Sequence, residues 1–179
     1  MTHKHVFSAV RSATLASLLV LGSGAVLAQN NGAIHVAGAI AAGSCSISTS
    51  PVNLGEHYSG DFSSGAGTPT NWVRVPITSQ GCSADIVTVH MGFDGAADTD
   101  NKGLFAVAST PGSARGLGIQ LQTEDGSVTV VPNSTTELVN WTPLATGGIY
   151  AMRARYVSTL PSVTPGDANS TVTVMLSYN

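Results

Sequence analysis

Apolar residues alternate with polar or small residues at a period of two in short runs along most of the chain. This alternation is typical of β-strands that are buried on one face only. Turn-forming Gly, Pro, Asp and Ser clusters separate the runs, and Asp125-Gly126 between two of them predicts a hairpin. Seven or more short strands with this spacing predict one all-β sandwich domain. The runs occupy 34–40, 73–77, 86–91, 117–121, 128–131, 149–156 and 172–178.

The composition supports a compact β-protein and excludes several other classes. Of the 179 residues, 42% are hydrophobic and 9% are charged, which is the opposite of the balance in disordered chains. Glycine, with 20 residues, is abundant, whereas a helical bundle would be rich in Leu, Glu and Lys. The formal net charge of -3 gives no electrostatic basis for binding nucleic acid or an anionic membrane.

The first 28 residues have the pattern of a secretory signal. Lys4 and Arg11 lie at a basic start, an apolar run follows from Ala13 to Leu21, and small residues end at Ala28. The apolar stretch is interrupted by Ser and Gly and is shorter than the roughly 18 residues that a membrane anchor needs. We therefore expect cleavage after Ala28, release of the mature chain outside the cytoplasm, and no membrane span in it.

Cys45 and Cys82 are the only cysteines. A lone pair in an exported protein is expected to form one disulfide. Their separation of 37 residues is too wide for a redox CxxC motif, and the histidines show no zinc-ligand spacing. Closing a loop of this size would stabilise the fold by about 4 kcal/mol in the chain-entropy description.

Both ends of the mature chain carry alternating apolar strands that need partners. At the N-terminus one face presents Gly32, Ile34, Val36, Gly38 and Ile40, and the other face presents Ala33, His35, Ala37 and Ala39. The C-terminal strand presents Val172, Val174, Leu176 and Tyr178 on one face. Both could be edge strands of one sandwich. Alternatively, one of them pairs with another molecule, because exposed strand edges favour intermolecular pairing.

These features, taken in order, resemble the type 1 fimbrial (pilin) subunits of the chaperone–usher pathway. The resemblance covers essentially the whole mature chain and includes the penultimate Tyr178. Its motifs are Gly32-Ala-Ile-His-Val-Ala-Gly-Ala-Ile40 before Cys45, Ser79-Gln-Gly-Cys82, Gly116-Leu-Gly-Ile-Gln-Leu121 before Asp125-Gly126, Ala154-Arg-Tyr156 and Thr164-Pro-Gly-Asp-Ala-Asn169.

The resemblance implies an immunoglobulin-like sandwich that lacks its last strand, so that an apolar groove lies open beside the first and last strands. In this family a periplasmic chaperone fills the groove first. At the outer-membrane usher, the N-terminal extension of the next subunit then replaces the chaperone strand. The implied organisation is a signal peptide at 1–28, a donor-strand extension at 29–43 and a pilin domain at 44–179.

The same resemblance assigns roles to residues at both ends of the chain. The groove-filling residues of the extension would be Gly32, Ile34, Val36, Gly38 and Ile40, with Gly38 where the two backbones approach most closely. The groove edge and chaperone contact would be formed by Val172, Val174, Leu176, Tyr178 and the carboxylate of Asn179. The implied partners are other pilin subunits, the chaperone and the usher.

Other chemistry is poorly supported by the sequence. No catalytic or phosphate-binding motif is present, and Glu56, Glu137 and Asp167 are scattered carboxylates. The loop Asp98-Thr-Asp100 imitates the start of a calcium loop, but Lys102 stands at a ligand position, so a solvated loop is expected. We expect no enzyme activity, no cofactor and no metal.

The function that we expect is a structural subunit of a surface fimbria, polymerised by donor-strand exchange and contributing to cell adhesion. The alternative is a monomeric, secreted β-sandwich that binds carbohydrate. That alternative requires a complete sandwich with a ligand surface around Trp72 or Trp141, whereas core packing is the expected role of each of these residues.

Overall fold

The computed structural model describes residues 37, 39 and 42–179. Alternating sequences form the strands, as expected where one face of each strand is buried. One short 3-10 helix, η1 (Ser59–Phe62), lies in the loop that precedes β2. The strands are β1 (Cys45–Thr49), β2 (Val73–Cys82), β3 (Val89–Asp94), β4 (Phe105–Ala106), β5 (Leu117–Thr123), β6 (Val139–Trp141), β7 (Ile149–Ser158) and β8 (Thr173–Tyr178).

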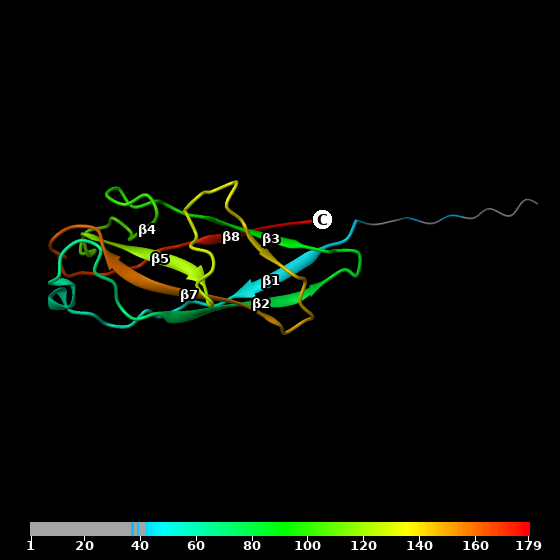
Figure 1. Cartoon of the computed structure of the whole chain (residues 1–179), viewed down its shortest axis with the longest axis horizontal. Coiled ribbons are helices and arrows are strands. Elements are labelled where there is room, and N and C mark those ends of the chain that lie inside the picture. The colour runs from blue at the N-terminus through cyan, green and yellow to red at the C-terminus, as the bar shows by residue number, and fades with distance from the viewer. Residues whose placement is uncertain (1–36, 38, 40–41) are drawn as a thin grey trace, which may run out of the picture. The chain divides into compact units, whose positions relative to one another are not determined.

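The strands form two antiparallel sheets that pack as a sandwich (Figure 1). One sheet has the order β1-β2-β7-β5-β4, and the other has the order β6-β3-β8. In the first sheet Val73 lies opposite Ala154 and Leu117 lies opposite Ser158, so that β7 is central. In the second sheet β3 is central, with Val89 opposite both Trp141 and Tyr178. The two sheets confirm the predicted all-β sandwich.

The core lies between the sheets and is built from the inward positions of the alternating strands. Its largest fully buried side chains include Tyr150, Phe105 and Met91, none of which is more than 1% exposed. Tyr150 also stacks edge-to-face on Trp141, with ring centroids 5.4 Å apart. Trp141 therefore packs against the core, as expected from the sequence.

Several predicted strand boundaries are wrong. The run predicted at 86–91 begins as a strand only at Val89, and just before it the N–H groups of Val87 and Thr88 share the carbonyl of Asn179 at 2.8 and 3.4 Å. The run at 128–131 forms no strand. After the predicted hairpin at Asp125-Gly126, Thr129 makes a single bridge to Gln122 and the segment then leaves the sheet. The short strands β1, β4 and β6 were not among the predicted runs.

Candidate functional site

The two sheets are left open along one side of the sandwich, between β1 and β8. Within residues 42–179, β1 pairs only with β2 and β8 pairs only with β3. β1, at the edge of the five-stranded sheet, and β8, at the edge of the three-stranded sheet, therefore each present one unpaired edge. Unpaired edges expose rows of backbone N–H and C=O groups that can bind another strand.

The C-terminal hydrogen bonds establish which residues of β8 direct their backbone groups into this gap. The N–H of Asn179 donates to the carbonyl of Thr88 at 3.3 Å, and the N–H of Thr88 donates back to the carbonyl of Asn179 at 3.4 Å. In an antiparallel ladder, such double pairs recur at every second residue. The intervening residues turn their N–H and C=O groups away from β3 and toward the gap. These residues are Val172, Val174, Leu176 and Tyr178.

Three of the same four side chains pack against the core, and Val172 and Val174 also line a cavity between the sheets. Val172, Val174 and Leu176 are half-buried against the core, whereas their neighbours Thr173, Met175 and Ser177 are exposed. Tyr178 has the same phase as the inward residues but remains 40% exposed at the end of the strand. The alternation predicted for this strand therefore places Val172, Val174 and Leu176 toward the core.

A cavity of about 490 Å³ opens between the strands at this edge. Its floor is the hydrophobic core itself, and none of the residues lining the cavity is charged. Such a surface fits apolar side chains and disfavours unpaired ionic ones. The lining consists of Thr49, Ser50, Pro51, Val52, Leu54, Val75, Ile77, Phe93, Phe105, Ile119, Leu121, Ala154, Ser170, Thr171, Val172 and Val174.

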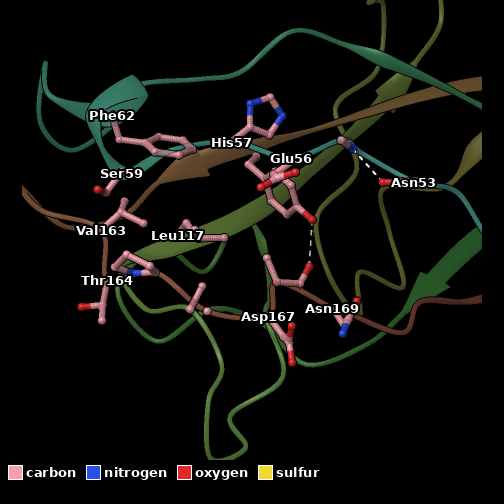
Figure 2. Close-up of a pocket in the computed structure, with 16 residues that line it drawn as sticks. Asn53, Glu56, His57, Ser59, Phe62, Leu117, Val163, Thr164, Asp167 and Asn169 are labelled. Carbon is pink, nitrogen blue, oxygen red and sulfur yellow. Dashed lines mark hydrogen bonds between the residues drawn. The ribbon is translucent and has the colours of Figure 1, made fainter.

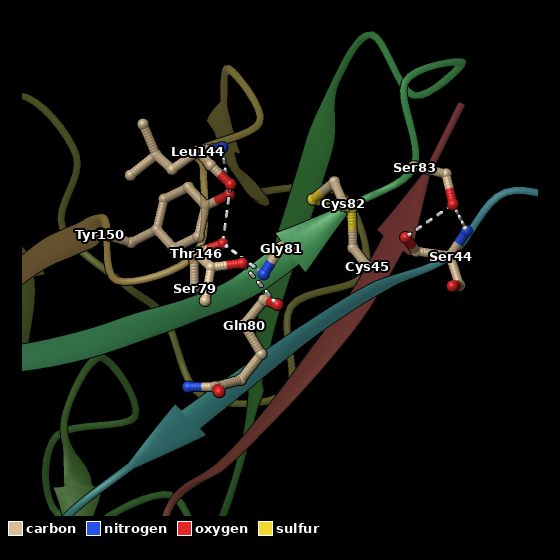
Figure 3. The surroundings of a disulfide bond; sticks show 10 residues. All are labelled: Ser44, Cys45, Ser79, Gln80, Gly81, Cys82, Ser83, Leu144, Thr146 and Tyr150. Atoms are coloured by element: carbon tan, nitrogen blue, oxygen red, sulfur yellow. Dashed lines mark hydrogen bonds between the residues drawn. A yellow bond between two sulfur atoms is a disulfide. The ribbon is translucent and has the colours of Figure 1, made fainter.

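The β1 side of the gap is held by a disulfide. Cys45 and Cys82 are bonded and directly opposite each other in the β1–β2 ladder, with their Cα atoms 4.1 Å apart (Figure 3). Beside them the N–H of Ser83 donates to the carbonyl of Ser44 at 2.9 Å. The disulfide therefore joins the first residue of β1 to the last residue of β2, at one end of the gap.

Buried polar groups brace the adjoining end of β2. The hydroxyl of Ser79 donates to the carbonyl of Leu144 at 2.8 Å, and the N–H of Leu144 donates to the hydroxyl of Tyr150 at 3.0 Å (Figure 3). Thr146 donates its hydroxyl hydrogen to the carbonyl of Gln80 at 3.0 Å. These bonds anchor the loop before β7 on the strand that carries the disulfide.

A second, polar cavity of about 340 Å³ lies next to Asn53 and Asn169 (Figure 2). The carboxylates of Glu56 and Asp167 both line it, although no sequence motif relates these two residues. His57 also lines this cavity and contacts the carbonyl of Leu54 at 3.1 Å through Nε2. The polar cavity adjoins the apolar one. Segments 49–54 and 170–174 line the apolar cavity, and the residues next to them in the chain line the polar cavity.

Tyr156 closes one side of the polar cavity and ties down the loop before β8. Its hydroxyl donates to the carbonyl of Ala168 at 2.9 Å, and partial burial raises the pKa of the phenol. The edge of its ring contacts His57, with ring centroids 5.9 Å apart. These contacts are structural, and no group of three or more metal-ligating side chains occurs within the described part of the chain.

Two expectations about individual side chains are corrected. Asp98 is buried rather than solvated, because its Oδ1 accepts the N–H groups of Asp100 and Asn101 at 2.9 Å each. It therefore closes a local turn. Trp72 does not pack in the core. It lies against the guanidinium groups of Arg153 and Arg155 on the outer face of the five-stranded sheet.

The predicted donor-strand residues lie outside the residues that the structure describes. They are Gly32, Ile34, Val36, Gly38 and Ile40. The described chain contains no helix that is both long and apolar enough to cross a membrane.

A two-sheet, immunoglobulin-like sandwich with an open side is the fold of pilus subunits, and the comparisons agree. The chain belongs to the fimbrial protein family, whose model matches residues 34–179. It is 27% identical to the fimbrial subunit type 1 of Salmonella typhimurium over 190 residues, covering 99% of this chain and 100% of that protein.

Two solved structures are also similar to this chain. A Burkholderia pseudomallei antigen and type I fimbria protein is 28% identical and matches with a TM-score of 0.55, covering 75% of this chain and 88% of that one. The P pilus rod subunit PapA matches with a TM-score of 0.60 over 75% of this chain and 99% of that one; at 18% identity it supports the fold alone. The chain is thus a structural subunit of a surface fimbria, and its relatives are structural subunits rather than enzymes.

Proposed function

We propose that this subunit polymerises by donor-strand exchange, with the extension at 29–43 of one copy filling the gap between β1 and β8 of another. The observation that carries the proposal is the phase of β8. Val172, Val174, Leu176 and Tyr178 offer their backbone groups and their side chains to the same gap. A strand that enters the gap would therefore gain main-chain hydrogen bonds and apolar contacts together.

The two segments match in length and in pattern. The acceptor edge presents four positions between Val172 and Tyr178, and the extension presents four between Ile34 and Ile40, both at a period of two. A one-residue slip would turn every apolar side chain of the extension out of the gap, so this match also sets the register. Burying Ile34, Val36 and Ile40 would contribute about 5–9 kcal/mol, at roughly 1.5–3 kcal/mol each.

Gly38 is the one small residue among the four alternate positions from Ile34 to Ile40. A glycine within a strand is unfavourable unless another backbone or side chain must come close to it. We infer that Gly38 occupies the place where the incoming strand approaches the acceptor most closely. This role would explain a glycine in a row of otherwise β-branched residues.

The remaining steps follow from the family resemblance and from export. Residues 1–28 would be removed as a signal peptide, and residues 44–179 would form the pilin domain. A periplasmic chaperone would occupy the gap and bind the carboxylate of Asn179 until the outer-membrane usher exchanges it for the extension of the next subunit. The role is structural and adhesive, without catalysis. The competing role of a complete, monomeric carbohydrate-binding sandwich is not supported, because the sandwich has an open side.

The test is the assembly of the full chain carrying Gly38→Leu, with Ala37→Leu as the matched control on the opposite face of the extension. For both variants we would measure the fibres on the cell surface and the high-mass polymers in samples that have not been heated. We expect Gly38→Leu to abolish polymers and Ala37→Leu to retain them. Normal polymerisation of Gly38→Leu would contradict the proposal.

A further inference from the structure

The outer face of the five-stranded sheet concentrates positive charge in an otherwise acidic domain. Arg74 on β2 lies directly opposite Arg153 on β7, and Arg155 lies two residues farther along the same face of β7. These are three of the five basic residues between 42 and 179, where ten residues are acidic. Like charges directly opposite each other in a sheet are destabilising, so this arrangement carries an electrostatic cost.

Trp72 joins two of these arginines into one surface. The guanidinium carbon of Arg155 lies 4.0 Å from the centre of the indole ring, and that of Arg153 lies 4.5 Å from it. Cation–π contact at these distances is favourable and holds both planar groups in place. All three side chains are only partly buried and remain accessible from solvent.

The two stacked arginines have neutral partners. Arg153 donates through Nε and Nη2 to Oε1 of Gln122 at 3.2 and 2.9 Å, and Arg155 donates through Nε to Oε1 of Gln120 at 2.8 Å. A guanidinium has five N–H donors, so most of their donors are unused by the described residues.

Their charges are also uncompensated. Among the described residues neither of these arginines forms an ion pair, and Glu124, just after β5, pairs instead with Arg74 at 2.9 Å. Partial burial, followed by the charge of Arg153, lowers the pKa of Arg155. Two guanidiniums are therefore oriented by neutral amides and an indole, with their charge directed to the outside.

We propose that Trp72, Arg153 and Arg155 form a binding site for the carboxylate groups of an acidic polysaccharide. Guanidinium groups bind carboxylates through two parallel hydrogen bonds, and here the unused donors face solvent. The indole beside them offers apolar surface to the sugar ring that carries the carboxylate. An incoming carboxylate would also relieve the repulsion between the arginines.

A polysaccharide fits this site better than a protein partner for two reasons. The site lies on the outer face of β2 and β7, whereas the apolar gap is lined by Val75 and Ala154 on the inner face of the same strands. Strand exchange therefore leaves the site uncovered. A fibre also repeats the site once per subunit, so that a polymer with a carboxylate on every sugar can bind many weak sites at once. The proposal does not depend on how the gap is filled.

The test uses intact fibres on immobilised polygalacturonate, with neutral dextran as the reference surface. The variant Arg153→Gln/Arg155→Gln is compared with Lys102→Gln/Arg115→Gln, which removes the same charge elsewhere. We expect wild-type fibres to bind polygalacturonate and not dextran, and to be released by salt or free galacturonate. The 153/155 variant should bind at least about tenfold more weakly, since it loses the charge-assisted hydrogen bonds to the carboxylate, and the control should change less than about twofold.

A second measurement requires no variant. Free galacturonate is expected to change the fluorescence of wild-type protein, because Trp72 lies at the site, while sodium sulfate of the same ionic strength has a smaller effect. The proposal is overturned if both double variants lose binding equally, if sulfate acts as strongly as galacturonate, or if wild-type fibres do not bind. It is also overturned if the 153/155 variant changes fibre packing without changing polygalacturonate binding, since the patch would then be a contact between copies.

Discussion

Asn179 and Thr88 exchange a pair of backbone hydrogen bonds at the very end of the chain. This pair sets the phase of the whole last strand. It places Val172, Val174, Leu176 and Tyr178 with their free backbone groups at the gap and their side chains toward the core. The hydrogen bonds of the last residue thus show which edge of β8 another strand would meet.

The first prediction compares neighbouring residues of β8. Leu176→Asp places a charge where the gap is apolar, whereas Met175→Asp places the same charge on a side chain that is 47% exposed. We expect Leu176→Asp to reduce fibre yield at least tenfold, since complete burial of a leucine by an incoming strand contributes about 1.5–3 kcal/mol and an unpaired charge cannot be buried there. Met175→Asp should assemble normally. Equal losses in both variants would contradict the phase assigned to β8.

The disulfide gives a prediction about stability. Replacing Cys45 and Cys82 together by Ser removes the bond between the ends of β1 and β2. We expect the free energy of unfolding to fall by about 4 kcal/mol for a 37-residue loop. This difference is measured by urea denaturation of the domain bound to a peptide of residues 31–42. Reduced wild-type protein is the control and should behave like the variant; a loss below about 1 kcal/mol would show that the bond contributes little.

The hydrogen bonds around Asp125 predict that the pKa of its carboxyl is unusually low. Hydrogen bonds from the Thr123 hydroxyl, and then from the Ser127 N–H and hydroxyl, lower the pKa of its carboxyl to about 2. Because the folded pKa lies below the unfolded value, the stabilisation is present above about pH 4 and is lost as the pH falls through about 2. Carboxyl NMR titration should give this low pKa, and Asp125→Asn should flatten the pH dependence of stability in that window. A carboxyl that titrates near 4 would show that these bonds do not persist in solution.

The partly buried phenol of Tyr156 predicts that the stability of the fold changes at alkaline pH. Partial burial raises the pKa of its phenol, so its contribution to stability is complete below about pH 10 and is lost as the pH rises through the folded pKa. Tyr156→Phe also removes the bond to the carbonyl of Ala168 and should cost about 0.5–1.5 kcal/mol. Ultraviolet titration of wild type against Tyr156→Phe isolates this phenol. A normal pKa together with unchanged stability would refute its anchoring role.

The sequence was sufficient to predict the sandwich and the inward face of the last strand. Both rest on the period-two pattern, which is set by burial on one side, and the alternation from Val172 to Tyr178 is unbroken. It failed at 128–131, where an equally apolar run leaves the sheet after one bridge. β5 does lie beside this run, because Thr123 donates to the carbonyl of Val128 and Val130 donates to the carbonyl of Leu121. The local pattern does not show how soon the chain turns away toward β3, where the N–H of Asn133 bonds to the carbonyl of Phe93.

The groups of residues that meet on the outer surface and at the polar cavity also could not be predicted from the sequence. Trp72 was expected in the core because aromatic residues usually pack there, yet the β2–β7 register brings it to two arginines more than 80 residues away. Glu56 and Asp167 meet at one cavity for the same reason. Such groupings depend on strand order and register, which alternation alone does not specify.

The central claim is that the gap between β1 and β8 is filled by the chain's own N-terminal extension in another copy. The most direct measurement is a thermal melt of the domain starting at Gly43, with and without a peptide of residues 31–42. We predict a large rise in the melting temperature with the peptide, and no rise when the peptide carries Gly38→Leu. A domain that is equally stable alone and ignores the peptide would contradict the claim, because its sandwich would already be complete.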